Sequence, residues 1–269
     1  QEQTGWTIVV ENKPGANSIL GADIAARAAP DGYTFLTVIG AHAANATLYA
    51  GRLPYDVVKS FSPVSLVGIA PLVMTVNNNL PVKDVKDLLA YVKANPGKVS
   101  FGSSGVGAAA HLTQELFKQN TGADIAHVPY KGTAPALSDL MGGNLQILTD
   151  TASALMPHVR SGKIKAVAVF SNKRIPGAAE VPTIAEAGVK GYEADFSLIL
   201  LAPKQVPDEV VNKFRMAVVE ALRTPEAAER LKATDQIVIG STPEEAVAKV
   251  NKDFAKWGTV ARKIGLSLD

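Results

Sequence analysis

Ser65 to Val76 reads SLVGIAPLVMTV, and Phe196 to Ala202 reads FSLILLA. Both runs are apolar and uncharged, which is typical of buried β-strands. Between them lies a block of about 120 residues that alternates strand and helix patterns, as a complete α/β domain does. The residues outside this block must then form a second domain together. This organisation predicts a hinged two-lobed clamp with a ligand cleft between its lobes.

We expect residues 1–75 and 196–269 to form the first lobe and residues 76–195 to form the second. The alternation of short β-branched runs with Ala-rich segments predicts an α/β fold with mainly parallel sheets. Further expected strands span 7–10, 34–39, 98–101, 125–128, 145–149 and 164–170. Expected helices span 19–29, 43–49, 85–94, 108–120, 134–141, 154–161, 208–223, 225–233 and 243–264.

The composition excludes several classes of protein. The chain has 27 Lys and Arg against 25 Asp and Glu, so its charge does not favour nucleic acid as a partner. It has no cysteine, which excludes thiolate catalysis, disulfides and cysteine zinc sites. No window approaches the roughly 18 apolar residues of a membrane span, and the first five residues are polar. We therefore expect neither a membrane span nor a signal peptide in this sequence.

The most informative local motif is FGSSGVGA, from Phe101 to Ala108, where an expected strand enters an expected helix. The N-terminus of a helix leaves backbone N–H groups unpaired and carries a partial positive charge. Glycines let a ligand approach the main chain, and the hydroxyls of Ser103 and Ser104 add donors. The motif therefore predicts an anion site; the alternative is a tight turn with an ordinary helix cap.

Three catalytic or nucleotide-binding interpretations of this motif are weaker. Gly105 and Gly107 match a relaxed dinucleotide fingerprint, but no acidic residue ends the next expected strand. A phosphate-binding P-loop would need Lys-Ser or Lys-Thr after the glycines, and a hydrolase elbow would need glycine in place of Val106. His111 could act on Ser103, but no supporting acid is evident, and a histidine that packs a helix is the favoured interpretation.

A second strand-to-helix segment, HVPYKGTAPA from His127 to Ala136, should reach the same edge of the sheet. Tyr130 could stack on a ligand or simply pack the loop, while Gly132 and Thr133 would offer donors and Lys131 would be solvated.

Asp150 follows the next expected strand, where it would either accept a hydrogen bond from a ligand or cap a helix near Ser153. In the outer segments, two further loops enter helices, one with Gly15, Ala16 and Asn17 and one with His42 and Asn45. The four histidines are scattered without the spacing of metal ligands, so no metal site is expected.

These motifs together resemble the tripartite tricarboxylate transporter solute receptors, also called Bug-type binding proteins. The matching stretches follow family order and cover nearly the whole chain: VVENKPGA from Val9, PDGYT from Pro30, FGSSGVG with His111-Leu112, HVPYKG from His127 and VPTIAEAG from Val181. The resemblance implies a type II periplasmic-binding-protein fold. It also implies a periplasmic location, membrane transporter subunits as partners, no cofactor and no catalytic residues.

By resemblance, the ligand is a small organic carboxylate held by main-chain donors, hydroxyls and waters. The residues nominated on one side of the cleft are Ser103, Ser104, Gly105, Gly107, Ala108, Tyr130, Lys131, Gly132, Thr133 and Asp150. Those nominated on the other side are Gly15, Ala16, Asn17, His42 and Asn45.

The sequence departs from the family pattern at Ala41, where Ser or Thr is common, and at Phe196-Ser197, where Trp is common. The family also opens with a further strand and loop, and Gln1 to Trp6 resembles only the tail of the helix that follows. We therefore expect a gap beside residues 7–10, and a monomer unless another chain supplies that strand. Two alternatives stay open, an α/β enzyme acting on a carboxylated molecule and a ligand-gated sensor.

Overall fold

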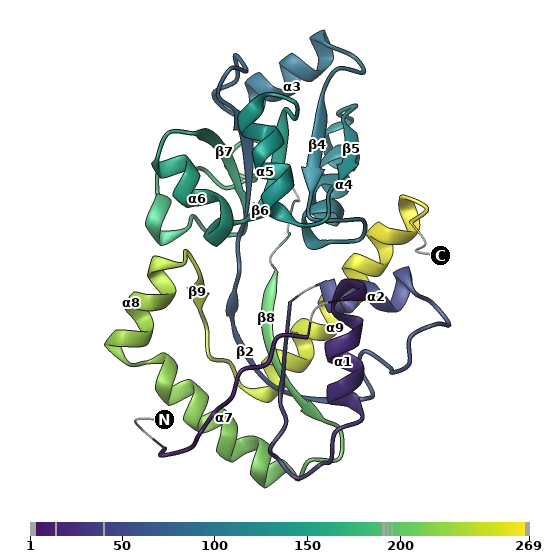
Figure 1. Cartoon of the computed structure of the whole chain (residues 1–269), viewed down its shortest axis with the longest axis vertical. Coiled ribbons are helices and arrows are strands. Elements are labelled where there is room, and N and C mark those ends of the chain that lie inside the picture. The colour runs from purple at the N-terminus through teal and green to yellow at the C-terminus, as the bar shows by residue number, and fades with distance from the viewer. Residues whose placement is uncertain are drawn as a thin grey trace. The chain divides into compact units, whose positions relative to one another are not determined.

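A computed structural model describes residues 4–13, 15–39, 41–189, 192, 194 and 196–266. The chain divides into two compact units, shown in Figure 1. The first comprises Gln1–Ile69, Ser197–Leu231 and Val238–Asp269, and the second comprises Ala70–Phe196 and Lys232–Ile237. The expected helix tail over residues 1–6 lies partly outside the described residues, which begin at Thr4.

The described residues of the first unit form a sheet with strand order β1-β8-β2-β9. β8 runs antiparallel to both β1 and β2. The strands of this sheet are β1 (Leu36–Ile39), β2 (Phe61–Ile69), β8 (Ser197–Pro203) and β9 (Ile237–Val238). The helices are η1 (Ala16–Ser18), α1 (Ile19–Ala26), α2 (Ala41–Leu48), α7 (Asp208–Leu222), α8 (Pro225–Ala233) and α9 (Pro243–Lys263). The boundary between the units crosses α8 after Leu231 and β9 after Ile237.

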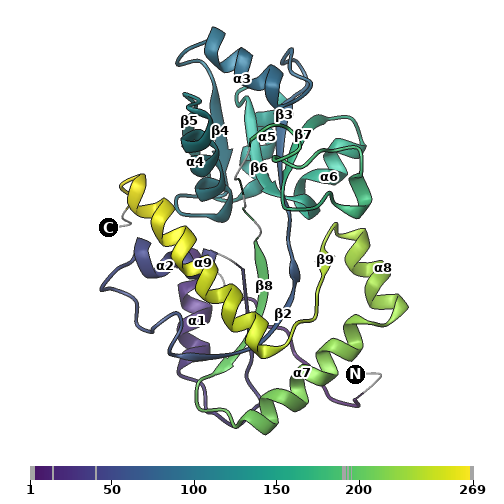
Figure 2. The ribbon, with the colours of Figure 1, turned by 180° about the vertical axis from the view of Figure 1, so that it is seen from behind.

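Alternate residues of β8 build two cores, one on each face of this sheet. Ile199 and Leu201 pack with residues of α1 and α9, while Leu200 and Ala202 pack with Val211 of α7. This separation follows from the period of two along a strand. Figure 2 shows α9 as the long yellow helix that passes beside α2. Its start carries a capping box in which Thr242 and Glu245 exchange side-chain to backbone hydrogen bonds.

The strand expected over residues 7–10 is wrong, because this segment is not paired with any strand that the structure describes. Ile8, Val9 and Val10 are 56%, 75% and 83% exposed. β-branched residues favour an extended backbone, but a strand also requires the hydrogen bonds of a neighbouring ladder. Trp6, just before the segment, instead stacks on Phe214 of α7 with ring centroids 6.2 Å apart.

The single long strand expected from Ser65 to Val76 is two strands, β2 and β3 (Leu72–Asn77). The break falls at Ala70-Pro71, since proline has no N–H for a ladder and restricts the residue before it. β2 belongs to the sheet of the first unit and β3 to that of the second. β2, which contains the beginning of the first apolar run, pairs directly with β8, which contains most of the second.

The second unit contains a five-stranded sheet of order β5-β4-β6-β3-β7. Its other strands are β4 (Ser100–Ser103), β5 (Ala126–Pro129), β6 (Ile147–Thr151) and β7 (Ile164–Phe170). Its helices are α3 (Val85–Ala94), α4 (Ala109–Thr121), α5 (Thr133–Gly142), α6 (Ala152–Arg160) and η2 (Pro176–Ala178). Leu148 of β6 packs with α5 and α6, whereas the next residue, Thr149, accepts a hydrogen bond from Gln114 of α4. The helices therefore cover both faces.

β4 runs parallel to β5 and β6, whereas β3 runs antiparallel to β6 and β7. The α/β class is confirmed, and both sheets contain antiparallel pairs that the strand and helix alternation did not predict. The parallel part matters for function because it brings the carboxyl ends of β4, β5 and β6 to one edge. Ser103 there lies in register with Pro129.

Candidate anion-binding site

Three strand-to-helix connections meet at this edge of the second unit, after β4, β5 and β6. Two backbone hydrogen bonds join the first two connections: Tyr130 N–H donates to Ser103 O at 3.1 Å and Gly132 N–H donates to Ser104 O at 3.2 Å. Thr133 joins the third by donating its hydroxyl to the Asp150 carboxylate at 2.7 Å. The residues predicted after β4, β5 and β6 therefore form one hydrogen-bonded group.

The turn from Ser103 to Ala108 leads directly into α4. Gly105 and Gly107 have φ of +149° and +76°, a backbone region that residues with a Cβ adopt only under strain. Ala108 is the N-cap residue of α4, and within the described residues no side chain caps that position. The ordinary side-chain cap weighed for this motif is therefore not found. The first N–H groups of α4 have no carbonyl partner within the helix itself.

The hydroxyl of Ser103 is held within the turn. It lies 2.7 Å from Nε2 of His127, donates to Gly105 O at 3.0 Å and accepts from Gly105 N–H at 3.3 Å. Ser103 is fully buried. A hydroxyl has one proton, so Ser103 cannot donate to the Gly105 carbonyl and also give a proton to a catalytic base.

His111 was the candidate partner of the Ser103 hydroxyl on the sequence, but the histidine that the hydroxyl contacts is His127. The feature that could have indicated His127 is the parallel pairing of β4 with β5, in which Phe101 is aligned with His127. Residues two apart on a strand share a face, so Phe101 and Ser103 both face the side where His127 lies. Burial first, and then the nearby His111 and Lys118, lower the pKa of His127 to about 3.

Tyr130 is half-buried and packs against the core of α5 and α6. Its hydroxyl donates to Asp139 Oδ2 at 2.7 Å. Loss of hydration and then the Asp139 carboxylate raise the pKa of Tyr130 to about 12. The contacts within this unit match the loop-packing alternative, and Lys131 beside it is exposed.

Asp150 is buried, with 8% of its surface exposed. Besides Thr133, it accepts the backbone N–H of Thr151 at 2.7 Å. Thr151 is the N-cap residue of α6, and Thr133 is the first residue of α5. Asp150 therefore links the starts of these two helices at the end of β6. Burial raises the pKa of this carboxyl.

In the first unit, two predicted loops meet through a pair of asparagines. Asn17 Nδ2 donates to Asn45 Oδ1 at 2.6 Å, and Asn45 Nδ2 donates to Asn17 O at 2.9 Å. Asn17 has φ 52°, a left-handed conformation that Asn tolerates better than most residues. Gly15, with φ +132°, precedes it, and Ala16 lies in η1.

His42 is packed within the first unit. The residue is 5% exposed, and its ring stacks on that of Tyr55 with centroids 5.8 Å apart and donates from Nε2 to Val57 O at 3.3 Å. Burial lowers the pKa of His42 to about 4. These contacts are those of a core histidine, and a contact of His42 with ligand stays a prediction.

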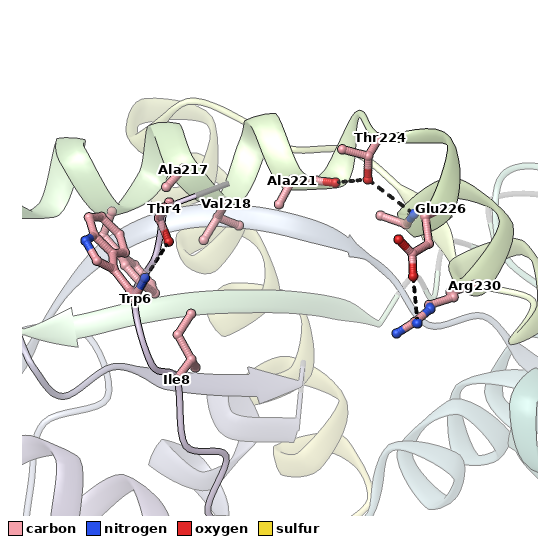
Figure 3. A pocket seen from close by; sticks show the side chains of 11 residues that line it. Thr4, Trp6, Ile8, Ala217, Val218, Ala221, Thr224, Glu226 and Arg230 are labelled. Carbon is pink, nitrogen blue, oxygen red and sulfur yellow. Dashed lines mark hydrogen bonds and ion pairs between the residues drawn. The ribbon is translucent and has the colours of Figure 1, made fainter. Parts of the chain in front are cut away.

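The first unit also has a groove of about 410 Å³ that the sequence did not predict (Figure 3). One end is apolar, with Trp6, Ile8 and Phe214, and the other holds the ion pair of Glu226 and Arg230 at 2.7 Å. None of the nominated site residues lines it.

Among the residues that the structure describes, there is neither a candidate membrane-spanning helix nor a candidate metal site. No helix there is long and apolar enough to cross a membrane. No group of three or more acidic or histidine side chains there has the arrangement of a metal site.

The chain is similar to known proteins over nearly its whole length, in both units. Protein BugT of Bordetella pertussis is 34% identical over all of this chain and 82% of its own length. The solved structure of R. palustris Rpa4515 with adipate has TM-score 0.89 and 34% identity, covering 99% of this chain and 89% of that one. MatC from Rhodopseudomonas palustris, solved with bound malate, has TM-score 0.79 and 29% identity, covering 91% and 85%.

Similarity to solved periplasmic binding proteins confirms the fold expected from the family motifs. The sequence profile described as "Tripartite tricarboxylate transporter family receptor" matches residues 1–266. The chain belongs to the tripartite tricarboxylate transporter receptor family.

Proposed function

We propose that this receptor captures a small dicarboxylate in the periplasm and delivers it to the membrane subunits of its transporter. The observation that carries the proposal is the turn from Ser103 to Ala108, whose two positive-φ glycines lead into a helix start without a side-chain cap. Such a turn offers main-chain N–H groups and the positive end of a helix dipole to an anion.

The ligand class is taken from relatives. Rpa4515 was solved with adipate and MatC with malate, and both ligands are small dicarboxylates. A buried carboxylate needs several hydrogen bonds in compensation for lost hydration, and N–H groups at a helix start supply them without an arginine. One carboxylate would therefore lie against the Ser103–Ala108 turn.

The remainder of the ligand would contact the second connection, from Tyr130 to Thr133, and Asp150. The proposal keeps the predicted lobes, residues 1–75 with 196–269 and residues 76–195. In it, the loops with Gly15, Ala16, Asn17, His42 and Asn45 close the cleft from the first lobe. Binding without a catalytic step is supported by the hydrogen bonds of Ser103, whose proton is committed to Gly105 O.

Isothermal titration calorimetry of the purified chain with adipate and malate tests the proposal, with adipamide and hexanoate as matched controls. Adipamide keeps the shape of adipate without its charge, and hexanoate lacks one carboxylate. We expect saturable binding of at least one dicarboxylate and at least tenfold weaker binding of the controls, because each lost charge removes charge-assisted hydrogen bonds of about 1.5–3 kcal/mol. Equal binding of adipate and adipamide would contradict an anion site.

A further inference from the structure

A column of three stacked rings lies beside the Ser103–Ala108 turn. Phe101 of β4 stacks on His127 of β5 with centroids 4.7 Å apart, and His127 stacks on His111 of α4 with centroids 3.8 Å apart and planes 12° apart. His111 is 5% exposed. Each histidine also has a ring nitrogen within hydrogen-bond distance of a residue of the turn, so the column does more than pack apolar surface.

His111 is joined to the turn through Gly107. The Gly107 N–H donates to Nδ1 of His111 at 3.0 Å. A nitrogen that accepts a hydrogen bond carries no proton, so the neutral ring must have its proton on Nε2. Nε2 lies 3.9 Å from Glu115 Oε1, beyond hydrogen-bond distance. A second proton could go only to Nδ1, where it would face the Gly107 N–H and end that bond.

His127 is joined to the turn through Ser103. Because the Ser103 hydroxyl donates to Gly105 O, the His127 Nε2 at 2.7 Å must be the donor of its own bond to that hydroxyl. Ser103 also accepts the Gly105 N–H. The stacked pair therefore holds both glycines of the turn, Gly105 through Ser103 and Gly107 directly.

We propose that His111 and His127 are positioning residues of the anion site: as a neutral stacked pair they hold the glycines so that the helix-start N–H groups face the carboxylate, and a proton on His111 releases Gly107 and weakens binding. The inference rests on the proposed function, because it assumes that the turn binds the ligand. It adds a pH-dependent release mechanism to that function.

The surroundings of the pair favour its neutral form at neutral pH. Burial is the main cause that lowers the pKa of His111, with Lys118 acting in the same direction and Glu115 against it. Lys118 and Glu115 lie on α4 and pair with each other at 2.8 Å, His127 faces His111 from β5, and β4 presents the uncharged Phe101. From β6, Thr149 faces α4 through Gln114 and is also uncharged.

The lowered pKa of His111 decides in which direction pH changes the hydrogen bond between His111 and Gly107. An unfolded histidine takes up its proton near pH 6.5, whereas folded His111 resists it to lower pH. The hydrogen bond from the Gly107 N–H to His111 is therefore fully present above about pH 6.5, and it is lost as pH falls through the pKa of His111 in the folded protein.

The test compares His111→Asn with His111→Ala, using adipate and malate as probes. Oδ1 of Asn occupies the place of Nδ1 and accepts a hydrogen bond, but it does not titrate. At pH 7.5 we expect His111→Ala to weaken binding roughly tenfold and His111→Asn to stay within about twofold of the wild type. Between pH 7.5 and 5 the wild type should lose more affinity than His111→Asn, which corrects for protonation of the acid itself. Equal losses of affinity in His111→Ala and His111→Asn would overturn the positioning role.

Nuclear magnetic resonance of the ligand-free chain gives a second readout that needs no ligand. Long-range proton–nitrogen spectra of the wild type should show His111 as the Nε2–H tautomer, and the Gly107 amide signal should shift with acid together with the His111 ring. The amide should exchange faster in His111→Ala and at the wild-type rate in His111→Asn. A protonated Nδ1 at pH 7.5, or a Gly107 amide indifferent to His111, would overturn the inference. If neither acid binds the wild type, the proposed function fails for these acids while the tautomer still decides the positioning role.

Discussion

Replacing Gly107 by Ala should weaken ligand binding far more than the matched change at Gly122. Both glycines have a left-handed backbone, with φ +76° before α4 and φ +69° at its C-terminus. Gly107 is buried in the turn, whereas a Cβ at Gly122 would meet nothing within 4 Å. The pair therefore separates backbone strain, which the two variants share, from damage to the turn.

The left-handed conformation costs a residue with a Cβ about 1–2 kcal/mol, and a smaller part is offset because alanine restricts the unfolded chain. We expect each variant to lower the free energy of unfolding by about 1 kcal/mol. In Gly107→Ala, a change of φ that relieves this strain would disturb the hydrogen bond from the Gly107 N–H to His111 Nδ1, which is 3.0 Å long, and with it the direction of the neighbouring N–H groups of the turn. A lost hydrogen bond to a charged ligand is worth about 1.5–3 kcal/mol, or roughly 10- to 150-fold in Kd.

Calorimetric titration with adipate or malate gives the two dissociation constants, and denaturant unfolding gives the two stabilities. Gly122→Ala should bind as the wild type does. Lys83→Ala, at an exposed residue just before α3, is a second control for binding. If Gly107→Ala stays folded and its Kd is within about threefold of that of Gly122→Ala, the reasoning about the turn is refuted.

Two further predictions concern the stability of the second unit. A Cβ at Gly102 would lie 2.5 Å from Leu145 Cδ2, so Gly102→Ala should lower the free energy of unfolding by about 1–3 kcal/mol, and an unchanged denaturation midpoint would show that the side chain moves freely. Arg160 donates to the buried carboxylate of Asp235 at 2.6 Å, so Arg160→Ala should cost about 1–3 kcal/mol of the unfolding free energy. Arg230→Ala, which removes an exposed ion pair with a side chain four residues away, should cost under about 0.5 kcal/mol, and equal effects of the two variants would contradict burial as the cause.

Sequence signals that act over a few residues determined where several of the helices and strands begin and end. The bounds of α3, α8 and β7 are those expected from periodicity and from flanking Gly, Pro and cap residues. Asp84, for example, caps α3 by accepting the N–H of Asp87 three residues on. The sequence also placed the serine turn between a strand and a helix, and its motifs indicated the correct family.

Contacts between residues far apart in the sequence decided which segments pair as strands and which side chains meet at the site. The apolar side chains of Ile8, Val9 and Val10 are exposed because a strand needs a neighbouring ladder, which local propensity does not provide. The pairing of β4 with β5 placed His127 against Ser103, 24 residues away, and set His111 beside it. Periodicity locates each residue on its own element, whereas only the packed sheet and helices decide which side chains meet, because those contacts depend on register between strands and on burial.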